Sequence, residues 1–104
     1  MASGILGQSA PTAATNTTVY TVPAGTTSTF NVSICNTGST EITARLAIAA
    51  TGTPGTSEWL EYNVLIPVAG VLERTGIVAQ ATKRVVVFVS AATASVSVFG
   101  FEEV

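Results

Sequence analysis

Few residues in this chain could carry out chemistry. The sequence contains six acidic residues, one cysteine and no histidine. All six acidic residues are glutamates. Because the chain has neither histidine nor aspartate, a Ser-His-Asp or Cys-His arrangement cannot be built. Glu58 and Glu61 are three residues apart in a region that predicts a strand, and side chains at that spacing point to opposite sides. Cys35 has no neighbouring cation that would activate its thiol. We therefore expect a protein that is not an enzyme.

Metal and cofactor sites also lack their usual residues. One cysteine without histidine cannot supply the ligands that zinc requires. No loop carries the several carboxylates that calcium needs, and no glycine-rich segment matches a nucleotide-binding fingerprint. We expect neither a metal nor a cofactor.

Trp59 and Tyr62 are the best candidates for binding. They lie close together beside the Gly/Pro-containing segment 51–55, and aromatic side chains are enriched at interface hot spots. The alternative is that both belong to the core, since aromatic residues also dominate small cores. Both are therefore candidate interface residues.

The composition limits the possible partners. Charged residues make up 10% of the 104 residues and hydrophobic residues 47%. A surface so poor in charge is poorly protected against association, which favours a homo-oligomer or a protein bound to partners. Four Lys and Arg residues and a net charge of −2 argue against nucleic acid as a partner. No apolar run is long enough to cross a membrane, and residues 1–7 do not resemble a signal peptide.

From Thr17 onward the pattern is typical of β-strands. Phe30, Val32 and Ile34 alternate with smaller or polar residues, which is the period of a strand with one buried face. Residues 84–89 are rich in β-branched side chains and predict a buried central strand. Strands are expected over residues 17–22, 30–35, 42–48, 58–66, 70–78, 84–89 and 94–101.

These strands predict an all-β fold. About seven short strands separated by turn residues, without an amphipathic helix, favour an antiparallel β-sandwich that is immunoglobulin-like or jelly-roll-like. A small barrel is the second choice. The length is that of one domain, and we assign residues 17–104 to the sandwich.

Residues 1–16 are expected to form an extended N-terminal arm outside that sandwich. They are small or polar, contain Pro11 and carry no charged side chain. Ile5 and Leu6 form a lone apolar pair, and an extended peptide can add to the exposed sheet edge of a neighbour with such side chains in pockets. Ile5 and Leu6 are therefore candidate anchoring residues. The alternative is a disordered tail.

Four short segments resemble small virion proteins of tailed bacteriophages. They are residues 6–11 (LGQSAP), 19–25 (VYTVPAG), 32–40 (VSICNTGST) and 98–102 (VFGFE). Together they extend over most of the chain. The resemblance implies a non-enzymatic β module of a capsid, neck or fibre.

We therefore expect a virion structural protein, first of all a capsid decoration (cement) protein that binds the major capsid protein and stabilises the particle. It would be made in the host bacterial cytoplasm and would reside in the virion. The alternative is a neck, tail or fibre component that binds a host surface or glycans. Low charge content and an arm-like N-terminus favour the first hypothesis, and exposed clustered aromatic residues would favour the second.

Overall fold

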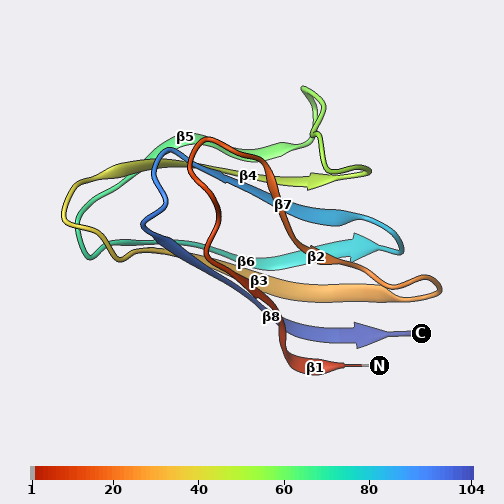
Figure 1. The fold of residues 1–104 in the computed structure, drawn as a ribbon. Helices are drawn as coiled ribbons and strands as arrows, with labels where there is room; N and C mark the ends of the chain where they lie inside the picture. The colour runs from red at the N-terminus through yellow and green to blue at the C-terminus, as the bar shows by residue number, and fades with distance from the viewer. Residues whose placement is uncertain (1) are drawn as a thin grey trace.

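The computed structural model describes residues 2–104, which form an all-β sandwich (Figure 1). Eight antiparallel strands make two four-stranded sheets, so the expected sandwich is confirmed with one strand more than the seven predicted. The strands are β1 (Ser3–Ser9), β2 (Thr17–Thr21), β3 (Thr27–Asn36), β4 (Ile42–Ala49), β5 (Trp59–Ile66), β6 (Val71–Gln80), β7 (Arg84–Val89) and β8 (Ala94–Glu103).

The strand order is nested. One sheet, which we call sheet A, has the order β1-β8-β3-β6, and the other, sheet B, has the order β2-β7-β4-β5. The first strand pairs with the last, the second with the seventh, the third with the sixth and the fourth with the fifth. Figure 1 shows the two sheets as stacked layers. Strands β1 and β6 are the edges of sheet A, and β2 and β5 are the edges of sheet B.

The core lies between the two sheets, and alternation within the strands builds it. Phe30, Val32 and Ile34 of β3 are at most 1% exposed, whereas the residues between them are partly exposed. Val85 and Val87 of β7 face them from the other layer and belong to the same buried cluster. Burial of each such side chain contributes about 1.5–3 kcal/mol, so this cluster holds the two layers together.

Strand β7 runs through the middle of sheet B, as its β-branched run predicts. Val86 is fully buried even though it belongs to a second cluster, apart from the main core. Ala47 and Ala49 of β4 are buried with it, and Trp59 packs against these small side chains. Ala47 is paired with Val86 on one side and with Trp59 on the other, so these side chains share one face of sheet B. Because their cluster is separate from the main core between the sheets, that face is the outer one.

The N-terminal segment differs from the expected arm. Residues 3–9 form β1, which pairs with β8 as an edge of sheet A, with one register shift between Ile5 and Gly7. An arm outside the sandwich is therefore wrong for these residues. The strand is inconspicuous in the sequence because it contains two glycines and a single β-branched residue. Residues 10–16 lead from sheet A to sheet B, and Met1 lies outside the described residues.

Three contacts, in addition to the pairing with β8, hold the first residues of the chain against the sandwich. Gly7 lies so close to β2 that a Cβ atom there would collide with a backbone carbonyl oxygen, and Leu6 packs against the core. The backbone N–H of Ala2 donates to Oε1 of Glu102 at 3.1 Å, while the hydroxyl of Tyr20 donates to Oε2 at 2.6 Å. One carboxylate therefore connects the first residues of the chain, β2 and β8.

Candidate binding site

The candidate site lies on β5, an edge strand with irregular pairing. The register between β4 and β5 shifts twice, once between Ala44 and Leu46 and once between Leu46 and Ala47. Near the first shift, Asn63 has a φ of 53°, in the left-handed region that asparagine tolerates better than most residues. An extra residue in one strand redirects nearby side chains. Here the irregularity brings Tyr62 over Arg45 of β4.

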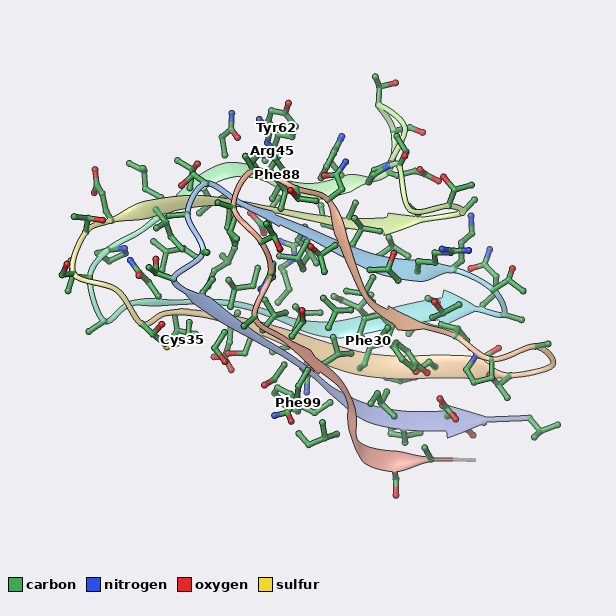
Figure 2. The ribbon with its side chains drawn as sticks, viewed as in Figure 1. Phe30, Cys35, Arg45, Tyr62, Phe88 and Phe99 are labelled. Carbon is green, nitrogen blue, oxygen red and sulfur yellow. The ribbon has the colours of Figure 1, made fainter. Side chains whose placement is uncertain are left out.

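Four side chains stack in a row on the outer face of sheet B. The guanidinium carbon of Arg45 lies 4.3 Å from the ring centroid of Tyr62 and 4.3 Å from that of Phe88. Tyr62 meets Trp59 edge to face, with centroids 5.3 Å apart and planes at 77°. Figure 2 shows Phe88, Arg45 and Tyr62 together on the side of sheet B that faces away from sheet A. We call these four residues the aromatic stack.

The aromatic stack is fixed by polar as well as ring contacts. Nε of Arg45 donates a hydrogen bond to Oδ1 of Asn63 at 2.7 Å. Ring–ring and cation–ring contacts at partly exposed positions each contribute about 0.5–1.5 kcal/mol. Tyr62 is therefore held in one orientation although 55% of its surface is exposed.

Glu58 holds the loop between β4 and β5. Its Oε1 accepts the backbone N–H of Gly55 at 2.7 Å, and its Oε2 accepts that of Ala50 at 3.1 Å. These two bonds favour the charged carboxylate, so they hold the pKa of Glu58 below its usual value of 4.5. The backbone N–H of Glu58 also donates to the carbonyl oxygen of Gly55. The loop over residues 50–58 therefore has a defined shape.

An open pocket of about 350 Å³ lies between this loop and β5. Thr56, Trp59 and Tyr62 line it, so its walls combine two aromatic rings with the polar groups that these side chains carry. The lining contains no Lys, Arg, Asp or Glu. This chemistry suits a small ligand that has an apolar face and groups able to hydrogen bond.

The four residues chosen from the sequence lie on both outer faces and at the core. Trp59 and Tyr62 contact each other on sheet B. Ile5 is 58% exposed on sheet A, whereas Leu6 packs against the main core. The structure therefore brings Trp59 and Tyr62 together but separates Ile5 from Leu6, which point in different directions on the same strand.

Ile5 belongs to a row of apolar side chains on the outer face of sheet A. The register pairs Ile5 with Phe99, and Phe101 lies two residues further along β8. Phe101 is paired with Thr29 of β3, which is paired with Val78 of β6. Phe101 is 44% and Val78 65% exposed. We call Ile5, Phe99, Phe101 and Val78 the apolar band. Figure 2 shows Phe99 on the opposite side of the molecule from Tyr62.

The sequence did not single out Arg45, Phe88 or the members of the apolar band other than Ile5. Arg45 and Phe88 occupy outward positions in their strands, and strand alternation could have marked them as exposed. The contacts of Arg45 with Tyr62 and with Phe88 depend on β4 pairing with both β5 and β7, and no local pattern indicates that pairing. The two glutamates considered earlier have different partners. Glu58 accepts hydrogen bonds from the loop backbone, whereas Glu61 forms an ion pair of 2.8 Å with Arg74.

Residues 2–104 contain neither a cluster of metal-binding side chains nor a membrane-spanning helix. In this part of the chain no group of three or more His, Cys, Asp or Glu side chains could hold a metal ion. The same residues contain no helix that is long and apolar enough to span a membrane. Comparisons of the chain with protein-family models, with curated proteins and with solved structures found no match.

Proposed function

We propose that this chain is a non-enzymatic structural protein of a tailed-bacteriophage virion, and that it decorates the capsid as a cement protein. The nested strand order supports this proposal, because an eight-stranded double sheet with this order is a jelly roll, an architecture common in viral capsid domains. Lectins and cupins also use jelly rolls, so the fold does not decide the function alone. The resemblance of four segments to phage virion proteins adds support.

The observation that carries the proposal is the apolar band on sheet A. Ile5, Phe101 and Val78 are 58%, 44% and 65% exposed, with Thr29 between Phe101 and Val78, and exposed apolar patches mark interaction surfaces. Burial of one such side chain contributes about 1.5–3 kcal/mol. Repetition over a symmetric particle converts a modest contact per copy into strong overall binding. We propose the major capsid protein as the partner, bound after synthesis in the host cytoplasm.

Association between copies is part of the same proposal. Only 10% of the residues are charged, which leaves the exterior poorly protected against association. Closed symmetric oligomers are the usual outcome for such modules. A homo-oligomer on the particle surface would bring several apolar bands to the capsid at once.

The test is binding of the purified protein to particles of the encoding phage that lack it. Phe101→Ser shortens the apolar band on a partly exposed strand, and we expect it to lower affinity about tenfold, which corresponds to ~1.4 kcal/mol. Val68→Ser is the matched control, because Val68 is 53% exposed in the turn between β5 and β6. Occupancy is read from stained gels of sedimented particles. Full occupancy by Phe101→Ser, with an unchanged circular dichroism spectrum, would contradict docking through this band.

A second candidate function is favoured by the pocket on sheet B. Exposed aromatic walls suit the head of a neck, tail or fibre component that binds a host surface or its glycans. The copy number per particle separates the two functions. Hundreds of copies support decoration of the capsid, whereas a handful supports a fibre or neck position.

A further inference from the structure

We propose that the pocket formed by Thr56, Trp59 and Tyr62 binds one neutral sugar unit of a glycan. This inference rests on the second candidate function and names the class of ligand that the pocket would take. The volume of about 350 Å³ lies at the small end of ligand pockets, which span about 300–1,000 Å³. It therefore suits one or two rings and not a long chain.

The walls of the pocket match the two kinds of surface that a sugar presents. A pyranose ring has a face of C–H bonds and a rim of hydroxyl groups. The C–H face fits an aromatic ring, whose face carries partial negative charge, and the planes of Trp59 and Tyr62 stand at 77° to each other. One ring can therefore cover the face of the sugar while the other limits its edge. The hydroxyl of Thr56 can both donate and accept a hydrogen bond at the rim.

The lining of the pocket favours a neutral sugar over an acidic one. Thr56, Trp59 and Tyr62 supply no cation that could pair with a carboxylate. Arg45 lies between Tyr62 and Phe88 and bonds to Asn63, and it is not among the lining residues.

The pocket is also organised before any ligand arrives. Arg45 and Trp59 fix the ring of Tyr62, and Glu58 fixes the loop through Gly55 and Ala50. Pre-organised side chains lower the entropy cost of binding. A single sugar unit nevertheless makes few contacts, so we expect a dissociation constant on the order of 1 mM.

The experiment uses Trp59, the single tryptophan of the chain, as a built-in fluorescent reporter. The protein is titrated with neutral trisaccharides of glucose, galactose and N-acetylglucosamine. It is also titrated with counterparts in which glucuronic or sialic acid replaces the terminal sugar unit. We expect a saturable change in fluorescence with at least one neutral trisaccharide. The acidic counterpart of that trisaccharide should bind at least tenfold more weakly.

Three variants locate the binding site. Tyr62→Ala removes one wall, and we expect it to weaken binding more than tenfold. Thr56→Ala changes only an exposed loop side chain, and we expect a loss of three- to tenfold, as for one hydrogen bond. Leu65→Ala is the matched control, because Leu65 lies on the same strand, is 60% exposed and does not line the pocket. Its affinity should be unchanged.

Three results would overturn the inference. The first is the absence of a saturable response to any neutral trisaccharide at 10 mM, roughly ten times the expected dissociation constant. The second is equal affinity for the neutral and acidic forms. The third is an equal loss of affinity in Tyr62→Ala and Leu65→Ala. If Tyr62→Ala instead lowers occupancy on particles without any sugar response, the pocket holds a protein side chain and the inference fails. The capsid proposal would still stand, since it is tested separately through Phe101.

Discussion

The outer face of sheet A carries the apolar band and the outer face of sheet B carries the pocket, and the strand pairing beneath the two faces also differs. On sheet A, the central strands β3 and β8 pair from Thr27–Glu103 to Asn36–Ala94 without a register shift, and the pairing of each edge strand, β1 and β6, contains one shift. On sheet B, the pairing of β4 with β5 shifts twice. The irregular pairing carries the aromatic stack, and the loop at its end closes the pocket. The apolar band therefore lies on the sheet whose central pair is unshifted, and the pocket lies beside the one strand pair that is shifted twice.

The comparison also separates the residues that support each face. Glu102 connects Ala2, Tyr20 and β8 at the edge of sheet A. Glu58 connects the loop to β5 at the edge of sheet B. Each face therefore depends on one carboxylate whose pKa is lowered by hydrogen bonds. The following predictions perturb first the core that both faces share, then each face alone.

The largest effect is expected for Phe30→Ala. Phe30 is 1% exposed in the shared core and meets Tyr20 edge to face at 5.9 Å. Removal of a buried aromatic ring costs about 3–5 kcal/mol, measured as the free energy of unfolding in urea. Docking and sugar binding should weaken together near the unfolding transition. Val78→Ala, on the exposed outer face, should change stability by less than about 0.5 kcal/mol. Equal losses in the two variants would contradict this account of the core.

An intermediate effect is expected for Tyr20→Phe, because the hydroxyl of this β2 residue bonds to Glu102 and Ser28 of sheet A. Ser28 keeps its bond to the carbonyl oxygen of Phe101, so we expect a loss of about 0.5–1.5 kcal/mol. Amide hydrogen exchange should accelerate in β1, while the fluorescence of Trp59 stays unchanged. A change in sugar affinity would show that the two faces are coupled.

The same tyrosine gives an alkaline signature. Burial, followed by the hydrogen bond to the Glu102 carboxylate, raises the pKa of Tyr20 from 10.0 to about 12. Because the folded pKa is the higher one, the stabilisation is complete below pH 10 and is lost as the pH rises through about 12. The unfolding free energy of Tyr20→Phe should lack this part of the decline.

The smallest and most local effect is expected for Glu58→Gln. The folded pKa of Glu58 is lowered from 4.5, so its contribution is present above that value and is lost as the pH falls through the folded pKa. Acid should therefore release the loop and change the fluorescence of Trp59. Glu58→Gln should show the changed signal already at neutral pH and little further change in acid. Glu73→Gln, on β6 of sheet A, should keep the wild-type profile; a flat profile in that variant would contradict the assignment.

Local alternation predicted most of the fold. Residues 30–35 and 42–48 show a period of two because one side of each strand must enter the core, and these residues do so in β3 and β4. The run from 84 to 89 lacks that period because both faces of β7 are covered, one by the main core and the other by Trp59 and its small neighbours. Burial leaves a direct mark on sequence in both cases.

Features that depend on distant pairing were not predictable in this way. The strand character of residues 3–9 comes from pairing with β8, more than 80 residues away, and their composition suggested an arm. The aromatic stack joins Phe88 of β7 to Tyr62 of β5 through Arg45. Trp59 and Tyr62 are close together in the sequence, but residues three apart in a regular strand point to opposite sides. Their contact depends on the irregular pairing of β5 with β4. The sequence did not indicate the bulge at Asn63 that turns Tyr62 toward Arg45.

The chain has one tryptophan and one cysteine, and they mark opposite layers of the sandwich. Trp59 lies on the outer side of sheet B, and the partly exposed, unbridged Cys35 lies on β3 of sheet A, where its register partners are Ser95 and Val71. An energy-transfer acceptor attached to the thiol would therefore form a donor–acceptor pair across both layers. The molecule thus contains its own spectroscopic ruler, which would report separation of the sheets without any added residue.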